Sequence, residues 1–265
     1  MSGHLATVRA IGAQPFAGPV YRSIVVVDLE GSTKRSNMAK GELRRVMYEL
    51  LDQALMAAGI GPDHLEELAD RGDGVLILIR PHDDVPKSAL VGRLIPVLAG
   101  LLAEHNAAAA RPELELRMRA VVHAGEVHED GRGFYGDDID VAFRLVNAPA
   151  VKRALREAAS SPLVLVVSEE IFSAVVRHGY VAAGGYEPAV RVQVGEQRRR
   201  GRVHIPVPAA TDRLAAIRRP RGLLLPTTPL PIPALTGRVP DQPTGRPALT
   251  TVNGHSLDQR PATCP

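Results

Sequence analysis

The run Ile24–Val27 consists of four β-branched residues and leads directly into Asp28. Four residues are too few for a helix, and an unbroken apolar run indicates a strand that is buried on both faces. Asp28 is therefore expected at the exit of a buried strand. A carboxylate there, followed by Gly31 where the backbone can approach a ligand, suits a divalent cation that carries phosphates, but Asp at a strand end is also a common turn former.

Helical and strand patterns alternate after this first strand. Apolar residues recur at helical spacing from Leu43 to Leu55. Gly72 and Gly74 supply the turn of a hairpin between strands near 65–69 and 75–79. The other expected elements are a helix over about 87–106, a half-buried strand over 114–125, helices over 138–148 and 151–159, a strand over 163–167, a helix after Ser168, and strands near 190–194 and 203–207. This order predicts an α+β fold with a mainly antiparallel sheet and flanking helices.

Composition sets the expected boundaries and compartment. The chain of 265 residues is 45% hydrophobic, enough for a real core, and becomes Pro-rich after about Ala210. We expect a flexible N-terminus over 1–20, one catalytic domain over 21–208 and a disordered tail over 209–265. The single Cys264 excludes a disulfide framework, and no continuous apolar run approaches the length of a membrane span, so a soluble cytoplasmic protein is expected. A net charge of +3 permits an anionic ligand without demanding nucleic acid.

Two further segments carry candidate chemistry. Asp73 lies in the tight turn RGDG, where it can share one cation site with Asp28 or hold an adjacent one, although a D-G pair also serves as a plain turn. Asp140 and Arg144 are four residues apart on an expected helix. That spacing suits an ion pair, but an arginine near the site can also meet charge that develops on a phosphoryl group.

Four segments, VVVDLEGST, RGDG, RMRAVVHAGEV and FYGDDIDVAFRL, resemble in order and spacing the class III nucleotidyl cyclases, the adenylate and guanylate cyclases, over about 21–207. The resemblance implies a ferredoxin-like domain that forms a homodimer with active sites at the interface. One subunit would hold two divalent ions, Mn²⁺ or Mg²⁺, through Asp28 and Asp73, and its partner would supply Asp140 and Arg144. The implied reaction is attack of a ribose 3′-hydroxyl on the α-phosphate of a nucleoside triphosphate, which releases pyrophosphate. The positions implied near the triphosphate are Leu29, Gly31, Ser32, Thr33 and Arg200, with Arg198 as a second candidate for the last.

Three positions depart from the family pattern. Asp140 stands where the family has an Asn that orients the ribose, and Ala69 and Gly133 occupy the two base-reading positions. Neither can hydrogen-bond a base through its side chain, so Arg71 and Asp70 are candidates to substitute. This pattern resembles the pyrimidine cyclases of bacterial Pycsar antiphage systems, which implies cyclic UMP or cyclic CMP as a messenger for a separate effector protein.

Three alternatives stay open. The chain could be a purine cyclase with altered base contacts, which would make cyclic AMP or cyclic GMP, or a catalytically weak cyclase-fold dimer that binds a nucleotide or a protein. The basic cluster over 198–202 is also typical of a solvated hairpin or of a nucleic-acid binder, but an aromatic content of 3% argues against the latter.

Overall fold

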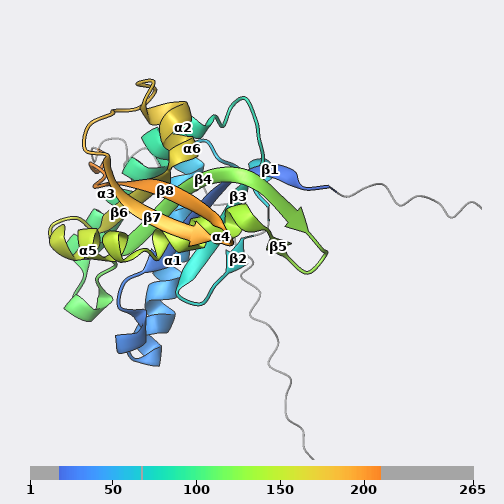
Figure 1. The fold of residues 1–265 in the computed structure, drawn as a ribbon. Coiled ribbons are helices and arrows are strands. Elements are labelled where there is room, and N and C mark those ends of the chain that lie inside the picture. Colours follow the sequence, from blue (N-terminus) through green and yellow to red (C-terminus); the bar gives the residue numbers. More distant parts are fainter. Residues whose placement is uncertain (1–17, 67, 210–265) are drawn as a thin grey trace, which may run out of the picture. The chain divides into compact units, whose positions relative to one another are not determined.

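The computed structural model describes residues 18–66 and 68–209. One sheet runs through this part in the order β2-β3-β1-β4-β6-β8-β7, and β5 pairs with β4 alone (Figure 1). Its strands are β1 Val20–Leu29, β2 Ala69–Asp70, β3 Gly74–Ile79, β4 Met118–Glu129, β5 Phe134–Tyr135, β6 Leu163–Ser168, β7 Glu187–Val194 and β8 Gln197–His204. All neighbouring strands are antiparallel except β4 and β6. The predicted α+β class with a mainly antiparallel sheet is confirmed.

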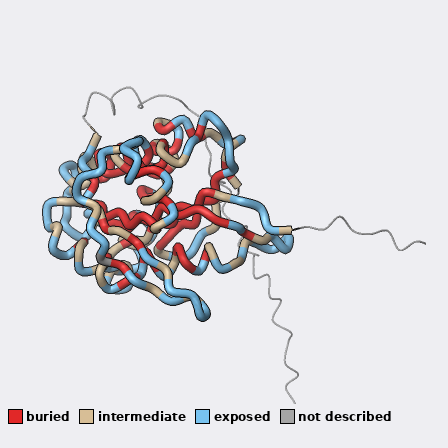
Figure 2. The backbone as a smooth tube through the Cα atoms, turned by 45° about the horizontal axis from the view of Figure 1, so that its top comes forward, coloured by how far each residue is buried: buried red, intermediate tan, exposed pale blue. Residues whose placement is uncertain are grey.

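Helices cover both faces of this sheet. They are α1 Asn37–Ala57, α2 Lys87–Ala89, α3 Ile95–Ala108, α4 Asp137–Val146, α5 Pro149–Glu157 and α6 Glu169–Ile171, with π-helical turns at Leu90–Leu94 and Phe172–Val176. Val25 and Val27 pack into the cluster that contains α1 and α3, whereas Ile24 and Val26 pack into the cluster that contains α4 and α5. The buried segments therefore follow the central strands (Figure 2). This two-sided burial explains the unbroken apolar run of β1.

One helical segment of the described residues, Lys87–Ala108, is long and apolar enough by length and composition to cross a membrane. Its most apolar window has a mean hydropathy of 1.3, and 61% of that window is buried. Leu90, Leu94 and Leu98 belong to the core cluster against α1 and the sheet. The segment thus packs as a core helix of the domain.

The expected strand over 114–125 was wrong in its start and in its burial. Pro112–Leu114 forms a 3₁₀ turn, and the side chain of Asn106 bonds both the N–H and the carbonyl of Leu116, at 2.7 and 2.8 Å. Those bonds hold the segment to α3, so β4 begins only at Met118. From there to Ala124 every residue is buried, because helices cover both faces of the strand.

The expected strand over 203–207 was also misplaced. The strand β8 spans Gln197–His204 and contains the arginine run, which pairs along its length with β7. Near 65–69, Leu65 makes only an isolated bridge to Ile79 before β2 begins. The expected N-terminal segment and Pro-rich tail lie outside the described residues, apart from a few residues at their inner ends.

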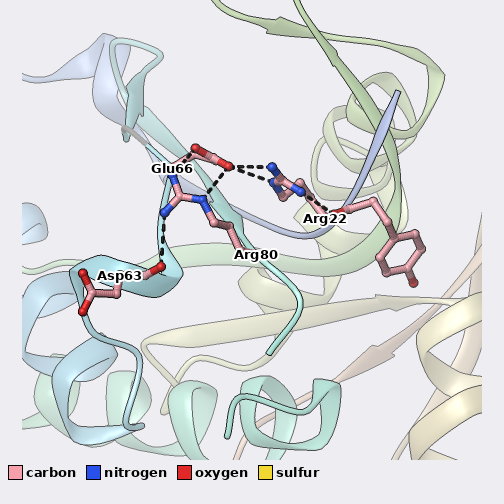
Figure 3. Close-up of polar contacts among 5 residues, drawn as sticks. Arg22, Asp63, Glu66 and Arg80 are labelled. Carbon is pink, nitrogen blue, oxygen red and sulfur yellow. Dashed lines mark hydrogen bonds and ion pairs between the residues drawn. The ribbon is translucent and has the colours of Figure 1, made fainter. Parts of the chain in front are cut away.

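An arginine clamp holds the start of β1 to the end of β3 (Figure 3). Glu66 accepts hydrogen bonds from Arg22 at 2.7 and 3.0 Å and from Arg80 at 2.6 and 2.9 Å. Burial alone would raise the pKa of Glu66, but the bonds from Arg80 and Arg22 outweigh it and hold the pKa below its ordinary value. The clamp secures the sheet near Arg22 and Arg80, at the end of the β1–β3 pair that lies opposite to Asp28.

Candidate active site

The two predicted metal ligands lie on neighbouring segments at one end of the sheet. Asp28 pairs with Gly74 across β1 and β3, and the Leu29 N–H donates to the carbonyl of Asp73 at 2.9 Å. A Cβ atom on Gly74 would lie 2.5 Å from the Val27 carbonyl oxygen, so only glycine lets the β2–β3 turn approach β1 this closely. The packing of β1 against that turn therefore brings Asp28 and Asp73 to adjacent positions.

Arg119 is a member of this site that sequence reasoning missed. It lies directly opposite Asp28 on β4, and its guanidinium Nη2 forms an ion pair with Asp28 Oδ2. Both side chains are mostly buried, with 11% and 14% of their surface exposed. The alternation of charge in LELRMR placed Arg119 on a half-exposed strand, whereas the signal that identifies it is its register opposite Asp28. The pair compensates a carboxylate that would otherwise be buried with its charge unopposed.

The chemistry of the donors fits a hard divalent cation. Within the described residues no group of three or more His, Cys, Asp or Glu side chains could hold a metal ion by itself. Mg²⁺ is commonly held by one or two carboxylates, with phosphates and water as its other ligands. Asp28 Oδ2 accepts no hydrogen bond in the described part of the chain and has only its ion pair with Arg119. Asp28 and Asp73 can therefore supply the protein's share of such a site.

The loop after β1 offers free backbone donors beside these carboxylates. Gly31 has φ +71°, a left-handed conformation that glycine adopts without strain, and Ser32–Lys34 forms a 3₁₀ turn. The N–H groups of Gly31 and Ser32 donate to no group in the described residues. Successive unpaired N–H groups of this kind favour an anion, which suits the predicted role of Leu29, Gly31, Ser32 and Thr33 near phosphates.

The predicted catalytic pair lies on α4 and is exposed. Asp140 and Arg144 form no ion pair with each other or with any other described residue, so the simple i, i+4 interpretation does not apply. The first turn of α4 is anchored instead by Asp138, which contacts His123 Nε2 at 3.2 Å and accepts the Glu126 N–H at 2.8 Å. The bond to His123 lowers the pKa of Asp138, and burial opposes that effect. Asp140 and Arg144 are therefore presented outward from a fixed helix.

His123 completes this anchor from inside the domain. It is 1% exposed, and its Nδ1 lies 2.8 Å from Ser168 Oγ at the start of α6. A Cβ atom on Gly125 would lie 2.0 Å from Asp138 Oδ2, so the contact of α4 with β4 depends on that glycine. The network ties β4, α4 and α6 together, which is the structural role expected for a buried, satisfied histidine.

The arginines of the last hairpin point to two different faces. Gly201 and Val203 of β8 face α4 and its cluster, so the alternation of the strand puts Arg199 on that face and Arg198 and Arg200 on the other. Arg199 lies 3.6 Å from Glu170, whereas Arg200 lies directly opposite Arg191 on β7 and has no carboxylate partner in the described residues. The assignment of Arg200 or Arg198 to phosphate binding stays a prediction.

Ala69 and Gly133, the two base-reading positions that carry no polar side chain, line one cavity of about 520 Å³. Ala69 contributes from β2, and Gly133 from the turn between β4 and β5. The other lining residues are Leu68, Asp70, Arg71, Asp130, Arg132, Phe134 and Tyr135. The structure therefore brings Ala69 and Gly133 to one pocket, together with both proposed substitutes, Asp70 and Arg71.

Comparisons with known proteins find likeness at the level of structure. Neither the family models nor the curated protein sequences give a match. An adenylate/guanylate cyclase/hydrolase from Silicibacter pomeroyi is similar at 16% identity with a TM-score of 0.52, over 72% of this chain and 99% of that one. The guanylyl cyclase Cya2 shows 16% identity and a TM-score of 0.49, over 71% and 93% of the two chains. A bacterial light-regulated adenylyl cyclase shows 12% identity and a TM-score of 0.46, over 75% and 96%.

The first of these similarities extends over nearly the whole length of the solved domain. At such low identity the agreement concerns the arrangement of helices and strands, and function has to be argued from the site. The sheet with helices on both faces, described above, is therefore the fold of an adenylate/guanylate cyclase catalytic domain.

Proposed function

We propose that this protein is a metal-dependent nucleotidyl cyclase, which converts a nucleoside triphosphate to a 3′,5′-cyclic mononucleotide and pyrophosphate. The observation that carries the proposal is the convergence of Asp28 and Asp73 through the Leu29–Asp73 backbone bond of 2.9 Å, on a cyclase-domain fold. The unpaired N–H groups of Gly31 and Ser32 beside these carboxylates support a phosphate-bearing ligand.

In this proposal, each of the candidate residues has a separate role in the reaction. Two divalent ions, Mn²⁺ or Mg²⁺, held by Asp28 and Asp73, would supply charge that lowers the proton affinity of the attacking hydroxyl and neutralises phosphates. Arg119 would hold the phosphates from the opposite strand once the carboxylate of Asp28 has another cation. Arg144, presented by α4 of the partner subunit in a homodimer, would stabilise charge on the α-phosphate, and Asp140 would orient the ribose.

The substrate and biological role are narrower parts of the same proposal. Ala69 and Gly133 put no polar side chain at the two positions where a purine reader is expected, which favours a pyrimidine triphosphate and hence cyclic UMP or cyclic CMP. By resemblance to antiphage pyrimidine cyclases, the product would act in the cytoplasm as a messenger for a separate effector protein. A purine substrate is the alternative within the same chemistry.

The test is incubation of the purified protein with ATP, GTP, CTP and UTP, each with Mn²⁺, and detection of cyclic mononucleotides by mass spectrometry. A cyclic pyrimidine is the expected product, whereas cyclic AMP or cyclic GMP would keep the cyclase and remove the pyrimidine part. Asp73→Ala should abolish turnover and keep the fold, because Asp73 is a half-buried turn residue outside the hydrophobic core. Wild-type turnover in that variant would overturn the metal assignment.

A second candidate function is nucleotide binding without catalysis. It is favoured by Asp140, a carboxylate that adds negative charge next to a polyphosphate. A folded dimer that binds nucleotides with Mn²⁺ but yields no cyclic product from any of the four triphosphates would establish this candidate instead.

A further inference from the structure

The carboxylates that line the Ala69–Gly133 cavity are largely committed to the protein itself. Asp70 forms an ion pair with Arg44 of α1 and accepts the Gly72 N–H at 2.7 Å. Asp130 accepts the N–H groups of Arg132 and Gly133 through one oxygen, at 2.9 and 3.0 Å, which closes the turn before β5. Both carboxylate oxygens of Asp70 are thus engaged within the protein, whereas one oxygen of Asp130 accepts no hydrogen bond in the described residues.

The two arginines of the cavity, unlike Asp70, have no charged partner within the described part of the protein. Neither Arg71 nor Arg132 has a carboxylate partner in the described part of the chain, although both line the cavity. Arg71 is the better placed of the two, because its guanidinium lies 5.5 Å from the centroid of the Phe143 ring on α4 and its backbone N–H donates to Gly74 at 2.9 Å. A guanidinium held on an aromatic ring keeps its donor fork oriented.

Tyr135 gives the same cavity a surface for a flat ring. One face of its ring stacks on His128, at 5.2 Å between centroids, and the residue is 52% exposed. Stacking on an aromatic ring strengthens binding of any base, because every base has a π-face. Affinity from Tyr135 and selection by Arg71 are therefore separable contributions.

We propose that Arg71 is the specificity-determining residue of this cavity and that it reads a base edge with two adjacent hydrogen-bond acceptors. This inference rests on the proposed function and deepens it. A guanidinium fork binds two neighbouring acceptors bidentately, as it does O6 and N7 of guanine. Among the pyrimidines only cytosine offers such a pair, O2 and N3, since a protonated N3 separates the two oxygens of uracil. The preferred substrate is accordingly CTP, and the product is cyclic CMP.

The test compares kcat/KM for CTP, UTP, GTP and ATP, with Mn²⁺, in the wild type, Arg71→Gln, Tyr135→Ala and the matched control Arg45→Gln on the exposed face of α1. The wild type should prefer CTP to UTP and ATP by about 10-fold or more, the range of one bidentate contact. Arg71→Gln should reduce that preference to within about threefold, Tyr135→Ala should lower all four values together, and Arg45→Gln should change none. An equal loss for all four substrates in Arg71→Gln would overturn the assignment, and a GTP preference that Arg71→Gln removes would overturn cytosine as the ligand.

A binding measurement separates this inference from the proposed function. Calorimetric titration with CMP and UMP needs no turnover, so it applies even if no triphosphate is cyclised. Tighter binding of CMP, lost in Arg71→Gln, would support Arg71 as the reader although the cyclase proposal had failed. Equal binding of CMP and UMP, or no binding of either, would overturn the inference whatever the enzyme assay gives.

Discussion

At the scale of single residues, the ion pair between Asp28 and Arg119 balances the charge of the candidate metal site before a metal binds. Two mostly buried side chains of opposite charge face each other across β1 and β4. Removal of one partner leaves the other buried with its charge unopposed, which costs more than the pair itself contributes. A divalent cation at Asp28 would take over the compensating role of the guanidinium.

Arg119→Met should therefore destabilise the metal-free protein by about 3–5 kcal/mol and make its stability more dependent on metal. Urea unfolding with and without Mn²⁺ measures both effects, and the gain from Mn²⁺ should be larger in the variant than in the wild type. Arg45→Met serves as the control, because its ion pair with Glu49 is solvent-exposed, with 60% and 53% of the two side chains accessible. An identical Mn²⁺ effect in the wild type and in Arg119→Met would contradict a metal site at Asp28.

Sequence reasoning reached Asp28 and Asp73 but not Arg119, for a physical reason. A carboxylate after an apolar run is visible in the sequence, whereas the residue opposite it depends on strand register, which single-sequence patterns do not specify. Only the family resemblance indicated that Ala69 and Gly133 belong to one base-binding site. The commitment of Asp70 to Arg44 was not visible at all, since the two lie 26 residues apart.

At the scale of elements, the arginine clamp around Glu66 makes the junction of β1 and β3 sensitive to acid. The folded pKa of Glu66 is lowered, so its contribution to stability is full above the unfolded-chain value of about 4.3 and is lost as the pH falls through the lower folded pKa. Glu66→Gln should cost about 1.5–3 kcal/mol at pH 7 and flatten the fall of stability below about pH 4.5. Urea unfolding as a function of pH measures both, with Glu49→Gln as the exposed control. A pH profile parallel to that of the wild type would contradict the clamp.

The position of α4 depends on Gly125. Since a Cβ atom there would lie 2.0 Å from Asp138 Oδ2, Gly125→Ala forces the first turn of α4 away from β4 and displaces Asp140 and Arg144. We expect turnover to fall about 100-fold, because a shift of about 1 Å in a positioning element has that effect. The control is Gly41→Ala on the exposed side of α1, where nothing lies within 4 Å and the change should stabilise the helix by about 0.5–1 kcal/mol. Unchanged turnover in Gly125→Ala would show that α4 is not fixed through Asp138.

Most elements were predictable because their apolar periodicity is strong and is not opposed by tertiary contacts. The seven buried apolar positions of α1 and the five apolar residues of β6 are of this kind. The wrong predictions concern segments whose structure is set by contacts with other parts of the chain. Asn106 holds the residues before β4, and β7 draws the polar run of arginines into β8. Such tertiary contacts override local pattern, so the boundaries of these two strands could not be read from the sequence.

At the scale of the whole molecule, the proposed cyclase site would take its residues from two chains. Asp28 and Asp73 lie at the end of β1, while Asp140 and Arg144 face outward from α4 and contact no charged side chain in the described residues. In a two-fold dimer, each subunit would give its carboxylates to one site and its α4 residues to the other. The proposal of a shared site therefore predicts that two inactive variants restore each other.

Asp73→Ala and Arg144→Ala should each be inactive as homodimers, but a heterodimer of the two contains one site with both residues intact. Equal mixing with random exchange of subunits gives half heterodimers, so about a quarter of the wild-type turnover should return. Co-expression with two different affinity tags, followed by sequential purification, isolates the heterodimer and raises the expected value to about half. The matched control is the heterodimer of the wild type with the double variant Asp73→Ala/Arg144→Ala, isolated by the same two tags because an unseparated mixture would keep about a quarter of the turnover as wild-type homodimers. This heterodimer also holds one copy of each intact residue, but both lie on the wild-type chain, so no shared site is complete. Turnover in the first isolated heterodimer and not in the second requires that Asp73 and Arg144 act from different subunits, whereas an inactive first heterodimer beside a half-active second one would place the whole site within one chain.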